Sequence, residues 1–246
     1  MGQQEYRFFP SGCYSECAFY CYDCWPPQYE WWEDFFARYR PRTAFFTARD
    51  AAAEFARRRA GMQAFWLPEA VDPNAYFPGR DLKYRRIHVL ELGRRHERIH
   101  QTWKRYLENR GYVHLYELEK GKLVFPTHED FINGLSESVV SVCFPSSMTH
   151  PERSGNTETV THRFFESMAS KCLIVGHAPQ ELIDLFGYNP IVELKPETCV
   201  EEIERILQNV ENYQPLVDKN YSALMQKGTW DVRVKTMLHM LGEVYA

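Results

Sequence analysis

The sequence predicts an α/β protein in which short strands alternate with helices and pair into parallel sheets. In the first 67 residues, apolar stretches with strand and helix periodicity alternate in the order β-α-β-α-β. Residues 139–144 (VVSVCF) form a nearly continuous apolar run, which is typical of a parallel strand buried on both faces. Residues 158–176 add an apolar helical face and another apolar strand. We therefore expect a complete α/β region after residue 80 and a smaller one before it.

The N-terminal elements follow from local signals. Residues 31–39 have apolar side chains at helical spacing, and Pro41 ends that helix. Residues 49–60 are rich in Ala and Arg and predict a second helix, which Gly61 stops. The flanking apolar segments 43–47 and 64–67 are predicted strands.

Four cysteines lie close together near the N-terminus. Cys17, Cys21 and Cys24 have the C-x3-C-x2-C spacing of a radical-SAM iron–sulfur site, and Cys13 precedes them. The surrounding segment CAFYCYDCWP is instead typical of a strand followed by a proline turn, in which these thiols do not converge. We expect structural cysteines here, with an iron–sulfur protein as a remote alternative.

Residues 66–79 (WLPEAVDPNAYFPG) contain three prolines and no periodicity, which predicts a linker. A strand at 87–92 and Gly93 follow, then basic residues and a helix from about 97 to 110. This order presents backbone N–H groups and positive charge to a phosphate. The candidates for that contact are Arg94, Arg95, Arg98 and Lys104, although the last two also fit a solvated helix face. The pattern is not G-x-G-x-x-G, so no nicotinamide cofactor is inferred.

The rest of the chain continues the alternation. We predict strands at 112–116, 139–144 and 191–194, and helices at 127–136, 179–186, 197–210, 213–226 and 230–244. Residues 145–157 are predicted to form a long polar loop that carries Ser147 and Thr157. Such loops, at the carboxyl ends of parallel strands, are where this class of fold binds ligands.

Two carboxylates, Glu158 and Glu166, bracket the start of the next predicted helix. At 3.6 residues per turn, eight residues advance about 800°, roughly 80° past two full turns. The two side chains would not align on one continuous helix. Threonines at 159 and 161 are credible N-caps, so we expect the helix to begin near them. Glu158 then lies in the loop, and both carboxylates can face one pocket.

The stretch ETVTHRFFESMASKCLIVG resembles the E-x7-E region of GT-B retaining glycosyltransferases, specifically the family-4-like and CgeB-type group. The linker also resembles the LP-x-x-VDP-x-x-F-P hinge of these enzymes. The resemblance covers residues 64–245 and implies a Rossmann-type donor-binding domain at 81–228, a hinge at 68–80 and a final helix at 229–246 that crosses back. Residues 1–67 would then be a shortened, truncated α/β acceptor-side domain.

The same resemblance implies roles for individual residues. Glu158 would contact the donor sugar and Glu166 the nucleotide ribose, while Arg163 would stabilise the leaving phosphate. Basic residues after Gly93 would hold the diphosphate, and the loop near Val124 would hold the base through its backbone. Two departures stand out: no Gly-Phe-Gly follows Glu158, and the basic residues lack the usual Arg-x4-Lys spacing.

Composition and charge limit the classes of partner and the cellular location that we expect. The net charge is −4, which does not indicate a wide nucleic-acid surface. Seven cysteines, the absence of a run of 18 apolar residues and an N-terminus without signal-peptide features predict a cytoplasmic chain without a transmembrane segment. The short acceptor-side region predicts self-association or a partner subunit that completes it.

The resemblance implies a retaining transfer of a sugar from a nucleotide-diphospho-sugar to an unknown glycan, lipid or protein acceptor. No Asp-x-Asp sequence is present, which agrees with chemistry that needs no metal or other cofactor. A second hypothesis is a catalytically silent subunit that binds nucleotide-sugars. The sequence does not name the sugar, the base or the acceptor.

Overall fold

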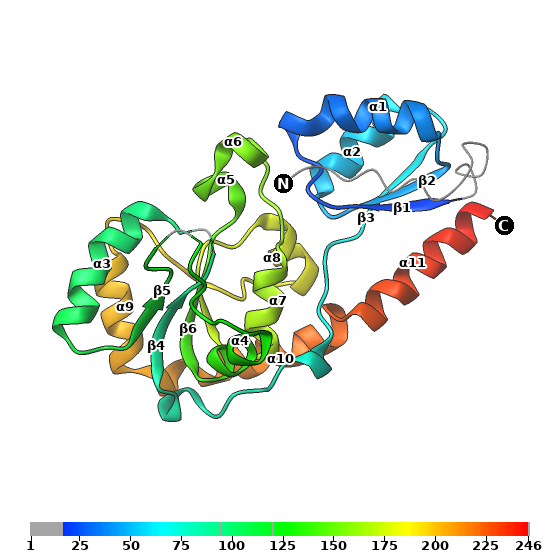
Figure 1. Cartoon of the computed structure of the whole chain (residues 1–246). Coiled ribbons are helices and arrows are strands. Elements are labelled where there is room, and N and C mark those ends of the chain that lie inside the picture. The colour runs from blue at the N-terminus through cyan, green and yellow to red at the C-terminus, as the bar shows by residue number, and fades with distance from the viewer. Residues whose placement is uncertain (1–16, 94, 120, 246) are drawn as a thin grey trace.

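The computed structural model describes residues 17–93, 95–119 and 121–245. It contains two lobes, each built around a parallel sheet (Figure 1). We call residues 17–67 the small lobe, residues 68–80 the linker segment and residues 81–228 the large lobe. Cys13 and Arg94 lie outside the described residues, so the expectations for them stay predictions.

The small lobe has three parallel strands in the order β1-β2-β3. Their bounds are β1 (Ala18–Cys21), β2 (Thr43–Phe46) and β3 (Gln63–Trp66), connected by helices η2 (Pro26–Gln28), α1 (Tyr29–Tyr39) and α2 (Arg49–Arg58). This confirms the predicted alternation. The core of the lobe is largely aromatic and includes Trp25, Phe36, Phe46 and Phe55.

The large lobe has five parallel strands in the order β5-β4-β6-β7-β8. They are β4 (Ile87–Glu91), β5 (His114–Tyr116), β6 (Ser138–Cys143), β7 (Leu173–Gly176) and β8 (Val192–Glu193). Every residue of β6 is buried, as its apolar run predicts. Because β5 lies on one side of β4 and β6 on the other, the strand order reverses between β4 and β6.

Helices cover both faces of this sheet (Figure 1). In chain order the helices from the linker segment onward are η3 (Pro73–Ala75), η4 (Leu82–Tyr84), α3 (Glu97–Asn109), α4 (His128–Ser136), α5 (Ser146–Thr149), α6 (Pro151–Ser154), α7 (His162–Ala169), α8 (Gln180–Phe186), α9 (Cys199–Gln208), η5 (Val210–Tyr213), α10 (Gln214–Lys227) and α11 (Trp230–Tyr245). Along β4, Val89 packs in the core beneath α3 and α9, whereas Leu90 packs in the core beneath α4, α7 and α8. The period-two alternation of strand side chains therefore fills two cores.

One stretch differs from its prediction. Residues 145–157 do not form a plain loop, because they contain the single-turn helices α5 and α6. Pro145 precedes the first of these helices, and Pro151 occupies the first position of the second. Proline is pre-organised for a helix start, so these two prolines provided a signal that the polar composition obscured.

Several contacts join the two lobes. Trp230, the first residue of α11, packs against Tyr20 of β1 with ring centroids 6.0 Å apart. From there α11 runs away from the large lobe, and its C-terminal end lies beside the small sheet (Figure 1). Gln28 donates a hydrogen bond from Nε2 to the Arg153 carbonyl. Glu181 of α8 accepts one from the backbone N–H of Arg49, at the start of α2.

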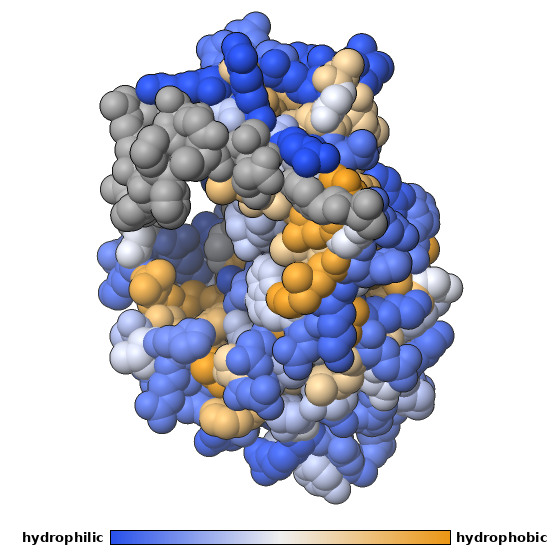
Figure 2. Space-filling model, turned by 90° about the vertical axis from the view of Figure 1, so that its right-hand side faces the viewer, coloured by the Kyte–Doolittle hydropathy of each residue, from blue (hydrophilic) through white to orange (hydrophobic). Residues whose placement is uncertain are grey.

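Apolar side chains gather on the face of the molecule that Figure 2 presents. Val234 and Leu238 of α11 are 47% and 62% exposed. The expected partner for the small lobe stays a prediction. Among the described helices, none combines the length and the apolar character that crossing a membrane requires.

Candidate functional site

The site lies where the strand order of the large sheet reverses. In open parallel sheets, ligands bind at this point, beyond the carboxyl ends of the strands. Two cavities occur there, and both are lined by Leu92, Gly93, Arg163 and Glu166. Leu92 and Gly93 follow β4, whereas Arg163 and Glu166 belong to α7.

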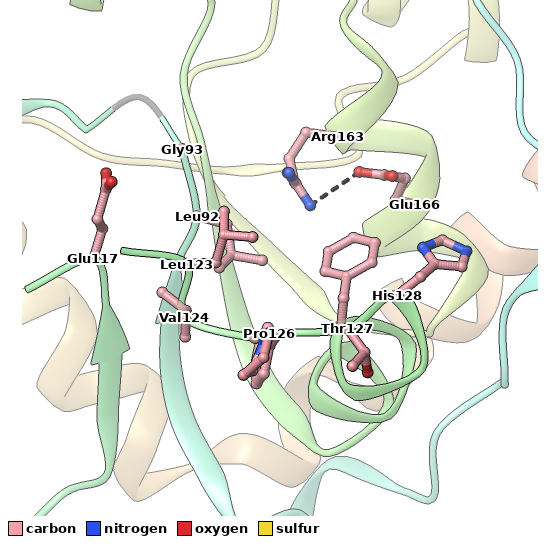
Figure 3. A pocket seen from close by; sticks show the side chains of 12 residues that line it. Leu92, Gly93, Glu117, Leu123, Val124, Pro126, Thr127, His128, Arg163 and Glu166 are labelled. Atoms are coloured by element: carbon pink, nitrogen blue, oxygen red, sulfur yellow. Dashed lines mark ion pairs between the residues drawn. The ribbon is translucent and has the colours of Figure 1, made fainter. Parts of the chain in front are cut away.

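The first cavity, which we call the apolar compartment, has a volume of about 460 Å³. Figure 3 shows its walls, to which the segment between β5 and α4 contributes Leu123, Val124 and Pro126. Val124, expected near the base, does line it. Phe125 and Phe131 also belong to the wall, and the volume is within the range of small-molecule sites.

The second cavity, which we call the polar compartment, has a volume of about 480 Å³ and lies between the lobes. The large lobe lines it with Arg153 of α6 and with Thr161, His162 and Arg163. Asp23 of the small lobe and Glu69 of the linker segment also line it. Arg153 and Arg163 are the arginines of this wall, which also holds three acidic residues, Asp23, Glu69 and Glu166. An anion in this cavity would therefore bind where it contacts the two guanidinium groups.

Glu166 stands at the junction of the two compartments. Its residue is 8% exposed, and its Oε1 accepts a hydrogen bond of 2.8 Å from the Tyr76 hydroxyl. Arg163 Nη1 lies 3.0 Å from Oε2, and His162 Nδ1 lies 3.5 Å from Oε1. Burial raises the pKa of Tyr76, and the nearby Glu166 carboxylate raises it further, so the phenol stays a donor.

Arg163 forms an ion pair with Glu166 and also packs against Phe131. The dashed line in Figure 3 marks their ion pair. The Nη1 atom is nevertheless buried without an aligned hydrogen-bond acceptor. Its guanidinium carbon also lies 5.1 Å from the centre of the Phe131 ring. A guanidinium has five N–H donors, so Arg163 can pair with Glu166 and still bind an anion.

The local sequence explains why Glu166 reaches this position. α7 begins at His162, next to the predicted threonines, and Glu166 lies in its first two turns as expected. Thr161 is the N-cap residue but its side chain makes no capping hydrogen bond. Phe164, Phe165 and Met168 bury the opposite side of the helix in the core.

Glu158 departs from its expectation. It does lie in the loop before α7, but it lines neither cavity. Its carboxylate instead contacts His177 Nε2 at 3.1 Å, and His177 Nδ1 contacts Glu193 at 3.0 Å. The backbone N–H of Val160 is bound by Glu181, which draws the intervening loop toward α8. The two carboxylates of the E-x7-E pattern therefore do not face one pocket.

The basic residues around α3 also lie elsewhere than expected. Arg98 pairs with Glu197, Lys104 covers the Tyr116 ring, and Arg95 donates to the Glu117 carbonyl. None of Arg95, Arg98 and Lys104 lines either cavity. The buried positions of α3 are Ile99, His100, Trp103 and Leu107, so residues such as Arg98 point outward.

Ser147 and Thr157, expected in the donor site, are absent from both cavity walls. Thr157 is 6% exposed. The hydroxyl of Ser147 is buried without a hydrogen-bond partner among the described residues. Gly93 does line both cavities and has φ of 72°, a conformation that favours glycine.

Sequence reasoning assigned no role to three groups of residues at this site. Tyr76 comes from the linker segment, and Arg153 comes from a helix predicted as a loop. The third group is a buried network at the edge of the large sheet, formed by Glu91, His100 and His114. For these residues, the one sequence feature that could have pointed to a role is the pair of neighbouring aromatic residues in the linker, Tyr76 and Phe77.

The Glu91 network could in principle hold a metal, because its ligand atoms lie within 4.8 Å of one another. Its contacts are those of hydrogen bonds: His114 Nε2 is 2.9 Å and Trp103 Nε1 is 2.7 Å from Glu91 Oε1. His100 Nδ1 lies 3.2 Å from each carboxylate oxygen. Burial raises the pKa of Glu91, but the two histidines outweigh it and lower the pKa to about 2. We interpret the group as an anchored carboxylate that ties α3 to β4 and β5.

Within the part of the chain that the structure describes, Cys17, Cys21 and Cys24 do not form a three-thiol metal site. Cys21 ends β1, and Cys21 and Cys24 are buried in the small-lobe core. No metal-ligand group among the described residues includes a cysteine. Burial raises the pKa of both thiols. The strand-and-turn interpretation of this segment is confirmed.

Searches of family models and of curated proteins give no match. Solved structures do match. They include Anabaena HepE in complex with UDP and glucose (TM-score 0.61, 8% identity, 92% of this chain and 71% of that chain). A second match is an α,α-trehalose-phosphate synthase (UDP-forming) from Burkholderia vietnamiensis, with a TM-score of 0.59 and 13% identity. It covers 92% of this chain and 68% of that chain.

A sucrose-phosphate synthase from Thermosynechococcus elongatus also matches, with a TM-score of 0.51 and 13% identity over 82% of this chain. The chain spans 58% of the length of that protein. At these identities the likeness concerns the fold. The chain has the Rossmann-like, parallel-sheet GT-B fold of these glycosyltransferases.

Proposed function

We propose that this chain is a glycosyltransferase that takes a sugar from a nucleotide-diphospho-sugar and transfers it with retention, without a metal. One observation carries the proposal: an apolar and a polar compartment meet at Glu166, Arg163 and Gly93. That sequence of environments matches the base, ribose and diphosphate of a nucleotide in order. The matched HepE structure, which contains UDP and glucose, supports the same proposal.

Each part of the donor has a suitable neighbour. A planar base fits the apolar compartment, where Phe125 and Phe131 supply aromatic surface. Ribose hydroxyls can donate hydrogen bonds to the Glu166 carboxylate. The diphosphate then reaches Arg163 and Arg153, whose charges stabilise the leaving group as the glycosidic bond breaks.

The sugar would extend through the polar compartment toward the small lobe, which borders the acceptor side. Transfer moves the glycosyl group onto an acceptor hydroxyl, and the hydroxyl proton leaves with the nucleoside diphosphate. We assign the donor site to Glu166, Arg163 and Arg153, because Glu158 lies outside both cavities.

The first test measures nucleotide binding through its effect on thermal unfolding. The ligands are UDP, GDP and ADP and their glucose conjugates. A ligand at 100 times its Kd raises the free energy of unfolding by about 2.7 kcal/mol. We expect one nucleotide to stabilise the chain, and Glu166→Ala to abolish that effect. Arg98→Ala, which removes an exposed charge paired with Glu197, is the matched control and should bind normally.

The second test is turnover with the nucleotide that binds. Release of nucleoside diphosphate, unchanged by EDTA, would support metal-independent chemistry, and NMR of the product anomer would decide retention. Tight binding without any donor hydrolysis or transfer would favour the silent nucleotide-sugar-binding subunit. Absence of binding by every nucleotide contradicts both.

A further inference from the structure

Tyr76 lies in the linker segment, yet its contacts are those of a binding-site residue. Its residue is 6% exposed, and its hydroxyl donates to Glu166 at the junction of the two compartments. Its ring centroid lies 6.4 Å from that of Phe131, which lines the apolar compartment. A segment that joins two lobes therefore reaches into the core beside the proposed ribose site.

The linker segment is fastened to the large lobe on both sides of Tyr76. Before it, Val71 N–H donates to the Gly228 carbonyl, and Trp230 N–H donates to the Val71 carbonyl. After it, Gly79 N–H donates to the carbonyl of Ser170, the C-cap residue of α7. A side chain at position 79 would also collide with the Ser136 carbonyl, since an added Cβ would lie 2.2 Å from that oxygen. Tyr76 is consequently held in a fixed relation to the helix that carries Glu166.

The hydrogen-bond capacity of Glu166 is divided among its neighbours. A carboxylate has about four acceptor positions on its two oxygens. Tyr76 takes one position on Oε1, and Arg163 lies against Oε2. At least two positions therefore remain, which is enough for the two hydroxyls of a ribose. Without the Tyr76 donor, Oε1 would face only His162, 3.5 Å away, and the carboxylate would be free to turn toward the two basic side chains.

We propose that Tyr76 is a positioning residue that orients Glu166, so that the site recognises ribose and rejects nucleotides that lack ribose hydroxyls. This inference rests on the proposed function. It adds a role for the linker segment: the piece of chain that joins the lobes is also part of the nucleotide site. It is specific to the hydroxyl of Tyr76, because the ring alone can fill the core.

The test compares wild type with Tyr76→Phe, which keeps the ring and removes the hydroxyl. Tyr84→Phe is the matched control, because Tyr84 is 56% exposed and follows the same linker segment. Each protein is titrated by calorimetry with uridine, guanosine and adenosine diphosphates and with their 2′,3′-dideoxy forms. For the base that binds best, we divide the dissociation constant of the dideoxy diphosphate by that of the ribonucleoside diphosphate. A high ratio means that the site prefers ribose.

We expect wild type and Tyr84→Phe to share one ratio and Tyr76→Phe to lower it roughly 5- to 10-fold, in line with the net contribution of one hydrogen bond. Affinity for the dideoxy form should stay the same, which a general loss of structure would not allow. Combining Tyr76→Phe with Glu166→Gln should add little to the loss caused by Glu166→Gln alone, because both changes act on one carboxylate.

The alternative outcomes are distinct. If no diphosphate binds to wild type, the proposed function fails, and this inference fails with it. If diphosphates bind and Tyr76→Phe keeps the wild-type ratio, the inference alone is wrong. A rise in ribonucleotide affinity in Tyr76→Phe would also overturn it, since Tyr76 would then be occupying a position that ribose needs.

Discussion

The two lobes are built from the same kinds of secondary structure and differ in strand order. Both sheets are parallel and both alternate strands with helices, but the small sheet runs β1-β2-β3 without a reversal. The large sheet runs β5-β4-β6-β7-β8, and its reversal leaves a crevice between β4 and β6. The two cavities share walls from this crevice. Topology, rather than the chemistry of the strands, therefore decides which lobe holds the proposed nucleotide.

The small lobe completes the site from outside. Asp23 lines the polar compartment, and Gln28 holds the backbone of Arg153. The Arg153 guanidinium lies 5.9 Å from the centre of the Trp25 ring. We therefore expect substitutions that disrupt the large lobe to abolish nucleotide binding, and substitutions that disrupt the small lobe only to weaken it.

The largest expected effect separates the two cores. Trp103→Ala in the large lobe and Phe55→Ala in the small lobe each remove a fully buried aromatic ring. Each should lower the free energy of unfolding by about 3 to 5 kcal/mol, measured by urea unfolding. At low temperature Phe55→Ala should still bind a nucleotide and Trp103→Ala should not. Equal loss of binding in both variants would contradict the division of labour between the lobes.

The next effect concerns the buried carboxylate at the edge of the large sheet. Glu91→Gln should cost about 3 kcal/mol at pH 7, because three donors lose a charged acceptor. The pKa of Glu91 is about 2 in the folded state against 4.5 for an ordinary glutamate. Its contribution is therefore present above about pH 4.5 and is lost as pH falls toward 2. Urea unfolding between pH 7 and 3 should show the gap to wild type closing, whereas exposed Glu97→Gln should show no gap at any pH.

A smaller effect, with the opposite pH dependence, concerns the contact between the lobes. Burial raises the pKa of Glu181 to about 7, although the N–H groups of Arg49 and Val160 oppose the rise. The folded state then holds a proton that the unfolded state releases near pH 4.5, so stability falls as pH rises between these values. From pH 5 to 8, wild type should lose roughly 2 kcal/mol relative to Glu181→Gln. Asp184→Asn, at an exposed partner of Arg49, should not change this dependence; a flat wild-type profile would refute the assignment.

The smallest effect separates the two glutamates of the E-x7-E pattern. Glu158→Gln should change nucleotide affinity less than about twofold, because Glu158 contacts His177 outside both cavities. Glu166→Gln should weaken binding at least tenfold, the usual cost of losing a charged acceptor. Calorimetry with the nucleotide identified by thermal unfolding measures both. A large loss in Glu158→Gln would show that Glu158 leaves His177 when the donor binds.

Local patterns in the sequence determined most of the architecture. The apolar run at 139–144, the amphipathic stretch before Asn109 and the prolines and glycines between elements indicated nearly every strand and helix. These signals are short-range, because strand and helix periodicity is written in neighbouring residues. The same locality placed Glu166 in the first two turns of α7, and Gly93 beside β4.

Tertiary structure alone decided which side chains share a cavity. Arg153 of α6 and Arg163 of α7 line one cavity, and Tyr76 of the linker segment contacts Glu166 at its wall. The sequence held no sign that these residues would meet. The predicted helix start suggested that Glu158 and Glu166 would face one pocket. The order of strand, glycine and basic residues made Arg98 a candidate for a phosphate contact. Glu158 instead found His177, and Arg98 pointed away because Ile99 and Trp103 occupy the buried face of α3. Periodicity fixes direction within one element, whereas a binding site depends on how separate elements pack against one another.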